Sequence, residues 1–262
     1  MFKGKRMLVT GAASGLGAAT VRAATAQGAK VLALDIQDSA GATLAAETDA
    51  NYLHCDVSQL DDWHKLRDQL TAADGMGAPD FLYLNAGIQI APVDAPMEDY
   101  QFDAMTLERY RRMMGVNVDG VVFGLHTLLP IMQPGSAVVV TCSLAGVTPY
   151  SVDPLYSMSK HAVTGLVRSM GPVLAARDIK INAICPGAVD TGIIPKAQRQ
   201  QLEANANPGA SLMMTPAQLA EDVLALFDAP ETGRTWAKVA ETKPPFIIRA
   251  PGDKTDTKKR AP

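Results

Sequence analysis

Short apolar runs alternate with longer segments of helical periodicity along most of the chain. In the longer segments Ala, Leu, Val or Met recurs every three or four residues, which places these side chains on one helix face. The runs predict strands at Arg6–Thr10, Lys30–Leu34, Asn51–Cys55, Phe81–Leu84, Ala137–Cys142 and Lys180–Cys185. The longer segments predict helices at Gly15–Gln27, Ala40–Thr48, Leu60–Ala73, Leu107–Leu129 and Tyr156–Ala176.

This order of elements indicates the fold class. Strands that are apolar on both faces and separated by helices are typical of a parallel sheet covered on both sides. Because the crossovers are right-handed, we expect an α/β fold with a doubly wound parallel sheet of Rossmann type. No linker or repeat divides the chain, so we expect a single domain over residues 1–251 and a polar tail at 252–262.

The connection over residues 188–215 breaks the alternation. It contains Pro195, Pro208 and Gly209, with a short helix expected around Lys196–Ala206. Connections of this length in compact domains are usually functional or disordered. We therefore expect this segment to act as a lid over a substrate site.

Composition excludes several classes of function. The chain has 24 Lys and Arg against 27 Asp and Glu, and only 5% aromatic residues, which gives no electrostatic or stacking case for binding nucleic acid or an anionic membrane. Cys55, Cys142 and Cys185 are far apart and each closes an apolar run, so we expect buried thiols and neither disulfide nor metal site. The longest apolar stretch, Val121–Met132, is too short to span a bilayer, so the expected location is cytoplasmic.

A glycine-rich loop follows the first expected strand. Thr10–Gly17 contains Gly11, Gly15 and Gly17 and leads directly into an Ala-rich helix. Such glycines allow a tight turn and close approach of a pyrophosphate, and the helix N-terminus supplies free N–H groups. The alternative is an ordinary turn between a strand and a helix.

Asp35 ends the second expected strand, 18 residues after Gly17. A carboxylate in this position accepts hydrogen bonds from the hydroxyls of the adenosine ribose and would repel a 2′-phosphate. The neighbours Ile36, Gln37 and Asp38 bring no cation to bind that phosphate. The sequence therefore predicts NAD(H) in preference to NADP(H), the alternative being that Asp35 is a solvated acid or a helix cap.

Tyr156 and Lys160 have the spacing that puts two side chains on one helix face. A phenol has an ordinary pKa of about 10 and is a poor acid or base at neutral pH unless a neighbouring ammonium stabilises its phenolate. Ser143 follows the fifth expected strand and could bind the same substrate oxygen. This spacing also occurs by chance on exposed helices, so the pair has weight only together with the other motifs.

The combined motifs resemble the short-chain dehydrogenase/reductase family in its compact, NAD(H)-dependent form. They occur in the family's order from about residue 5 to about residue 195. The matching positions are the Thr10–Gly17 loop, Asp35, Asp56-Val57, Asn85-Ala86-Gly87, Asn117, Ser143, Tyr156, Lys160, and Pro186-Gly187 with Thr191.

The resemblance implies catalytic roles for four residues. Tyr156 would exchange a proton with the alcohol or carbonyl oxygen, and Ser143 would orient that oxygen. Lys160 would lower the pKa of Tyr156 and hold the nicotinamide ribose, and Asn117 would anchor a water that links Lys160 to solvent. The alternative for Asn117 is a polar residue at a helix kink.

It also implies a coenzyme site. Asp56 and Val57 would lie at the adenine, Asn85–Gly87 beside the adenosine ribose, and Thr191 near the nicotinamide carboxamide. The full expected set is Gly11, Ser14, Gly15, Leu16, Gly17, Asp35, Ile36, Asp56, Val57, Asn85, Ala86, Gly87, Tyr156, Lys160, Pro186, Gly187, Val189 and Thr191.

The expected substrate pocket is apolar and has no Arg or Lys clamp. Its candidate residues are Gln89, Leu144, Ala145, Tyr150, Ile193, Ile194, Met213 and Met214. This set favours a hydrophobic secondary alcohol or its ketone, for example a steroid or terpenoid alcohol, and a Met-containing lid would adapt to irregular shapes. The alternative for Leu212–Met214 is that they only cover the core.

The C-terminal segment departs from the commonest pattern of the family. Lys243–Ile248 stands where many members have a glycine pair at a tetramer interface, and this ending resembles the branch of hydroxyprostaglandin dehydrogenases. We therefore expect a homodimer or a homotetramer, without a choice between them. Two rival functions are a non-catalytic NAD-binding sensor, which would not need Ser143, Tyr156 and Lys160, and an epimerase or dehydratase, whose members are typically longer.

Overall fold

The computed structural model describes residues 1–204 and 213–249. Its centre is one eight-stranded sheet in the order β3-β2-β1-β4-β5-β6-β7-β8. The strands β1 to β7 are parallel, and β8 pairs antiparallel with β7. Their bounds are β1 Arg6–Thr10, β2 Lys30–Asp35, β3 Asn51–His54, β4 Phe81–Leu84, β5 Ala137–Thr141, β6 Lys180–Pro186, β7 Arg234–Lys238 and β8 Phe246–Ile248.

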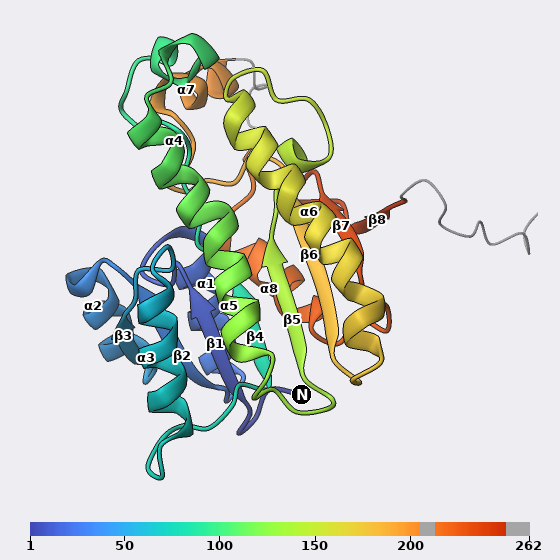
Figure 1. The fold of residues 1–262 in the computed structure, drawn as a ribbon. Coiled ribbons are helices and arrows are strands. Elements are labelled where there is room, and N and C mark those ends of the chain that lie inside the picture. The colour runs from blue at the N-terminus through green and yellow to red at the C-terminus, as the bar shows by residue number, and fades with distance from the viewer. Residues whose placement is uncertain (205–212, 250–262) are drawn as a thin grey trace, which may run out of the picture.

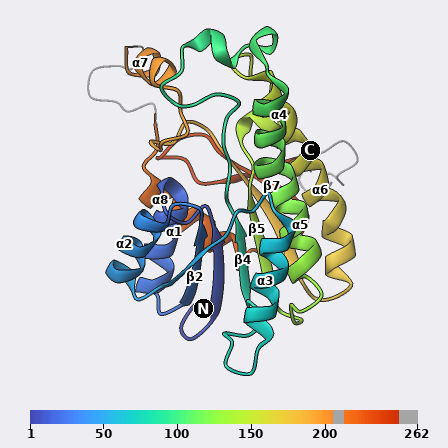
Figure 2. The same ribbon diagram turned by 60° about the vertical axis from the view of Figure 1, so that its left-hand side comes forward.

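Helices cover both faces of this sheet (Figures 1 and 2). Their bounds are α1 Gly15–Ala26, α2 Asp38–Thr48, α3 Leu60–Thr71, α4 Leu107–Met114, α5 Gly120–Leu128, α6 Pro154–Ala175, α7 Lys196–Ala204 and α8 Pro216–Leu226. The helices α1, α2 and α8 pack on one face, and α3, α5 and α6 pack on the other. The expected doubly wound α/β fold is confirmed.

Alternation along each strand builds the two layers of the core. In β5, Ala137 and Val139 belong to the layer with α1 and α8, whereas Val138 and Val140 belong to the layer with α3 and α5. Successive strand side chains point to opposite faces, so a strand buried on both faces must be apolar throughout. This explains why apolar runs, and not alternating ones, mark the strands in the sequence.

The expected strands agree with the structure to within one residue, and Cys55, Cys142 and Cys185 are free and buried as expected. The elements outside the expected set are α8, although Thr215 caps it and Pro216 starts it, and the strands β7 and β8, of which β8 is antiparallel. The helix expected at Ala40 begins at Asp38. Across residues 1–204 and 213–249, no helix combines the length and the apolarity that crossing a membrane requires.

Candidate active site

A cleft of about 1150 Å³ runs along the edge where β1, β2, β4, β5 and β6 end. Carboxyl ends of parallel strands are the usual place for ligand sites in this type of sheet. Most of the residues expected at the coenzyme and the catalytic centre line it: Gly11, Ser14, Gly15, Leu16, Asp35, Ile36, Asp56, Val57, Asn85, Ala86, Gly87, Ser143, Tyr156, Lys160, Pro186, Gly187, Val189 and Thr191. Gln89, Leu144, Ala145, Tyr150, Ile193 and Ile194 line the same cleft.

The glycine-rich loop closes tightly on itself at the start of α1. Gly11 has a φ of +62°, in the left-handed region that favours glycine. Gly17 does not line the cleft, but a Cβ on it would meet the Gly11 carbonyl oxygen at 2.0 Å. Gly17 therefore lets the first turn of α1 pack against the loop, which places the free N–H groups of this turn at the cleft.

Side chains of two neighbouring strands fix this loop. The Thr10 hydroxyl accepts hydrogen bonds from the main-chain N–H groups of Asn85 and Ala86, at 2.9 and 3.1 Å. Asn85 Nδ2 donates to the carbonyls of Thr10 and Gly11, at 3.1 and 3.3 Å. The ends of β1 and β4 are thus joined, and these bonds fix the floor of the cleft.

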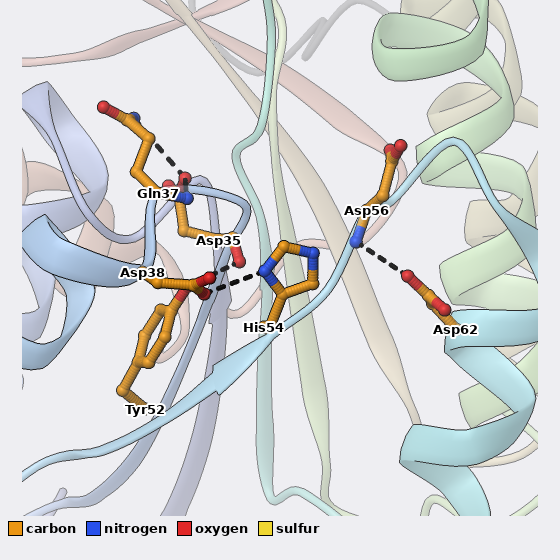
Figure 3. Close-up of polar contacts among 7 residues, drawn as sticks. All are labelled: Asp35, Gln37, Asp38, Tyr52, His54, Asp56 and Asp62. Atoms are coloured by element: carbon orange, nitrogen blue, oxygen red, sulfur yellow. Dashed lines mark hydrogen bonds and ion pairs between the residues drawn. The ribbon is translucent and has the colours of Figure 1, made fainter.

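Asp35 is 7% exposed at the end of β2, and its carboxylate is held from two sides (Figure 3). Oδ2 accepts from the Ala13 main-chain N–H at 2.9 Å, and Oδ1 accepts from the Gln37 main-chain N–H at 3.0 Å. These contacts link the glycine-rich loop to β2 and fix a negative charge at the cleft wall. No Arg or Lys is among the described residues that line this part of the cleft, beside Asp35, Ile36 and Gln37.

Asp56 follows β3 (Figure 3) and lines the same cleft as Asp35. Its Oδ1 accepts from the Ser58 N–H at 3.0 Å and from the Ser58 hydroxyl at 2.7 Å. Its own main-chain N–H donates to Asp62 Oδ2 at 3.1 Å. The side chain is therefore oriented by its own loop, and Oδ2 has no hydrogen bond within the described part of the chain.

Asn117 lies in a π-helical turn, Gly115–Asp119, which interrupts the helix expected over Leu107–Leu129. Its side chain is fully buried. Oδ1 accepts from the Ile88 N–H and Nδ2 donates to the Ile88 carbonyl, both at 2.8 Å, and Nδ2 also donates to Ser159 Oγ at 3.0 Å. Such π turns are frequent at functional sites. Here the turn aims an amide at the loop after β4 instead of at the open cleft.

Ser143, Tyr156 and Lys160 meet on the cleft wall, from the end of β5 and the first turns of α6. Lys160 Nζ donates to the Thr141 carbonyl at 3.0 Å and lies 5.6 Å from the centre of the Tyr156 ring. A Cβ on Gly87 would lie 3.2 Å from Lys160 Nζ, so the loop after β4 approaches the ammonium closely.

Burial sets the acid–base properties of this group. It raises the pKa of Tyr156, and a hydrogen bond with Ser143 opposes this rise. Burial also lowers the pKa of Lys160. The sequence led us to expect that Lys160 lowers the pKa of Tyr156, but in the structure this pKa is raised. The reason is that desolvation of the phenolate outweighs all other effects on the pKa. The hydrogen bond with Ser143 is the main effect that lowers it.

Asp153 was missed by the sequence reasoning and positions the first turn of α6. It is fully buried, its Oδ1 accepts from the Tyr156 N–H at 2.8 Å, and its Oδ2 accepts from the Ile90 N–H at 2.9 Å. Burial raises the pKa of this carboxyl. An acid immediately before Pro154 at a helix start is the pattern of an N-cap followed by proline, and could have revealed it.

The connection after β6, expected to be a lid, has contacts with the rest of the protein on both sides of its undescribed part. Met214 forms an isolated parallel bridge with Val189 and is 3% exposed within the core layer that contains α8. Neither Met213 nor Met214 is among the described residues that line the cleft, so Met214 covers the core and its placement in the substrate pocket is corrected. An ion pair between Arg199 and Asp190 holds α7, which begins at Lys196 as expected. The expected continuation to residue 206 and the tail at 252–262 lie outside the described residues.

Comparison with known proteins gives consistent matches. The family described as short chain dehydrogenase matches residues 5–202. The 2,5-dichloro-2,5-cyclohexadiene-1,4-diol dehydrogenase of Sphingobium indicum is 35% identical over 75% of this chain and 77% of its own. A 3-alpha-(or 20-beta)-hydroxysteroid dehydrogenase of Mycobacterium bovis is 36% identical over 72% of this chain and 70% of its own. The solved structure of BdcA in complex with NADPH has a TM-score of 0.76 at 25% identity, covering 90% of this chain and 93% of that one.

The match spans most of the chain and includes the glycine-rich loop, Ser143, Tyr156 and Lys160, which the fold brings to one cleft. Members of this family use a nicotinamide coenzyme. The chain therefore belongs to the short-chain dehydrogenase family, as an oxidoreductase that acts on CH–OH groups.

Proposed function

We propose that the protein interconverts a hydrophobic secondary alcohol and its ketone with NAD(H), using Tyr156 as the general acid and base. One observation carries this proposal: Ser143, Tyr156 and Lys160 line the same cleft as the Asp35 carboxylate. A coenzyme-binding sensor would need the Asp35 end of the cleft alone, so the second group favours an enzyme.

The cleft residues fit a dinucleotide. The close packing at Gly17 leaves the N-terminus of α1 open toward the cleft for a pyrophosphate, and Asp56 Oδ2 is available to accept from an adenine amino group. Asp35 would accept from ribose hydroxyls, Lys160 would hold the second ribose, and Thr191 would border the nicotinamide. When bound, the coenzyme supplies the hydride acceptor or donor.

NAD(H) is preferred in this proposal because of charge. The Asp35 carboxylate is held by the N–H groups of Ala13 and Gln37 and would repel a 2′-phosphate. Like charges brought together at a binding site cost several kcal/mol unless a cation intervenes. The solved structure of BdcA has the same fold and is in complex with NADPH, so in this proposal the choice depends on these side chains and not on the fold.

Proton transfer is assigned to this chain's own groups. In alcohol oxidation the Tyr156 oxygen would take the hydroxyl proton while Ser143 orients the substrate oxygen, and in ketone reduction Tyr156 would return the proton. The Ser143 hydrogen bond lowers the pKa of Tyr156 against the effect of burial, which eases proton release. Lys160 adds a positive charge near the Tyr156 ring.

The substrate class follows from the rest of the wall. Ile88, Leu144, Ile193, Ile194 and Leu202 make this region apolar, and no Lys lines the described cleft except Lys160. Arg109 and Arg112 are the arginines among the described lining residues, from α4, and Arg109 pairs with Asp99. Both relatives named above carry ring alcohols in their names, so we propose a cyclic secondary alcohol of steroid or terpenoid kind.

A panel assay tests the proposal. Cyclohexanol, borneol and a 3α-hydroxysteroid are incubated with NAD or NADP, and reduced coenzyme and ketone are measured together. The proposal predicts equal amounts of ketone and NADH, with NAD preferred, and little product from glycerol or glucose. Coenzyme binding without turnover of any alcohol would favour the sensor function, and activity confined to charged or sugar substrates would overturn the substrate class.

We also propose that copies of the chain associate as a homodimer or homotetramer. The two long helical segments leave apolar side chains exposed, with Val122 39%, Met158 42% and Val173 56% exposed. Scattered apolar residues are normal on a surface, so sedimentation of the purified protein decides the assembly state.

A further inference from the structure

The apolar wall of the cleft is interrupted by three polar side chains near Tyr156. Gln89 follows β4, Tyr150 precedes α6, and Gln198 lies in α7, and all three line the cleft. The Tyr150 ring stands edge-on to the Tyr156 ring, with 6.1 Å between their centres. This polar group is therefore next to the residue proposed to transfer the proton.

Tyr150 has hydrogen bonds with both Gln198 and Gln89, but Gln89 does not find a full set of partners. The Tyr150 hydroxyl donates to Gln198 Oε1 at 2.8 Å. Gln89 Nε2 donates to the Ile193 carbonyl at 3.0 Å, but Gln89 Oε1 is buried and has no hydrogen-bond partner among the described residues. A buried acceptor without a donor is unfavourable, because it has lost its hydrogen bonds to water and has gained none in the protein.

The orientation of the Gln89 amide is fixed by its neighbour. The Ile193 carbonyl can only accept, so the donor end of the amide must face it and the acceptor end must face away. Reversing the amide would set two acceptors against each other. The unpaired oxygen is therefore a stable feature of this arrangement.

The backbone of Gln89 is also held on both sides. The N–H of Ile88 donates to Asn117 Oδ1 at 2.8 Å, and the N–H of Ile90 donates to Asp153 Oδ2 at 2.9 Å. Both acceptor side chains are fully buried. A recognition group held in this way binds with a smaller loss of conformational entropy.

We propose that Gln89 Oε1 accepts a hydrogen bond from a second hydroxyl on the substrate, so that the favoured substrate is a cyclic diol and not a simple cyclic alcohol. An acceptor calls for a donor, which a hydroxyl supplies and a ketone or ether does not. The reacting carbinol would lie at Tyr156, and the second hydroxyl would lie elsewhere on the ring. This inference rests on the proposed alcohol oxidation.

A matched pair of substrates tests it. Cyclohexane-1,4-diol and 4-methylcyclohexanol differ by a hydroxyl in place of a methyl group of similar size. The cis and trans isomers are assayed separately with NAD, and kcat/KM for the diol is corrected for its two equivalent carbinols. The inference predicts that wild type prefers the better diol isomer by about tenfold. A preference for 4-methylcyclohexanol would overturn it.

Variants separate recognition from a structural role of the Gln89 amide. In Gln89→Leu, which has no acceptor, we expect the diol preference to fall about tenfold. In Tyr150→Phe, which keeps Gln89 and its bond to Ile193 but loses the neighbouring hydroxyl, we expect the preference to remain. If Gln89→Leu lowers kcat/KM for the two substrates in equal proportion, Gln89 only holds the Ile193 loop and the inference is wrong. If wild type oxidises neither substrate nor any alcohol in the panel, the proposed function itself fails.

Discussion

The ammonium of Lys160 lies 5.6 Å from the centre of the Tyr156 ring and donates a hydrogen bond to the Thr141 carbonyl, not to the phenol. Burial acts on both groups, raising the pKa of Tyr156 and lowering that of Lys160. Each shift favours the neutral form, as desolvation requires. The hydrogen bond between Ser143 and Tyr156 is the main contact that favours the phenolate.

This relationship predicts how Tyr156 titrates in the protein without coenzyme. The absorbance of the Tyr156 phenolate is obtained by subtracting the pH titration of Tyr156→Phe from that of wild type. This absorbance should develop only above pH 10, the ordinary pKa of a phenol, because the pKa of Tyr156 is raised. Ser143→Ala should move it higher still. Since a raised pKa favours the folded state below the unfolded value, Tyr156 should make wild type lose stability as pH rises above about 10. A Tyr156 phenolate already formed near neutral pH would contradict the account.

Asp35 predicts coenzyme selectivity. Combining Asp35→Ala with Ile36→Arg removes the charge facing the ribose and adds a cation at an exposed neighbouring position, Ile36 being 56% exposed. The ratio of kcat/KM for NAD to that for NADP should fall about a hundredfold. Asp38→Asn is the matched control, because Asp38 bonds Tyr52 and His54 and does not line the described cleft. Unchanged coenzyme selectivity in the double variant would contradict the role of Asp35 in the preference for NAD.

The packing of Gly17 predicts opposite effects for two glycine substitutions. In Gly17→Ala the new Cβ would meet the Gly11 carbonyl oxygen at 2.0 Å, so the loop must move. We expect a loss of about 1–3 kcal/mol in the free energy of unfolding and weaker coenzyme binding. Gly165→Ala is the control: nothing lies within 4 Å of its Cβ in the middle of α6, and a gain of about 0.5–1 kcal/mol is expected. Urea denaturation measures both, and equal effects would refute the close packing.

Asp38 and His54, close to Asp35, form a titrating pair (Figure 3). His54 Nδ1 lies 2.8 Å from Asp38 Oδ1, and this hydrogen bond raises the pKa of His54 and lowers that of Asp38. The ion pair is fully formed between the lowered pKa of Asp38 and the ordinary His pKa of about 6.5, and it is lost as pH rises through the raised pKa of His54. NMR titration should show the His54 pKa falling in Asp38→Asn and falling less in Asp62→Asn, whose charge acts on His54 without a direct bond. A larger effect of Asp62→Asn would contradict this order.

Much of the fold could be predicted from the sequence because its signals are local. Strands buried on both faces are continuous apolar runs, and the helix over Gly15–Ala26 follows a glycine-rich loop. The missed helix α8 also has local signals in its Thr215 cap and Pro216 start. Its Leu219 and Val223 are fully buried, at helical spacing, against α1.

The candidate site was less predictable where it depends on tertiary packing. Periodicity could not show that the helix containing Asn117 widens into a π turn, because this depends on the Ile88 backbone that the amide contacts. Met214 was expected in the substrate pocket because it is apolar and lies in the connection over residues 188–215. Its bridge to Val189 instead places its side chain in the core. The unpaired oxygen of Gln89 arises only from the loop around Ile193, far away in the sequence.

The most direct test of the central claim is turnover of a cyclic secondary alcohol by wild type and Tyr156→Phe in the same assay, with NAD binding measured in parallel. We predict that wild type forms ketone and NADH in equal amounts. Tyr156→Phe should bind NAD nearly as well and lose activity by at least about a hundredfold, because it keeps the ring and loses only the hydroxyl that moves the proton. Turnover by Tyr156→Phe at a rate close to that of wild type would contradict the account.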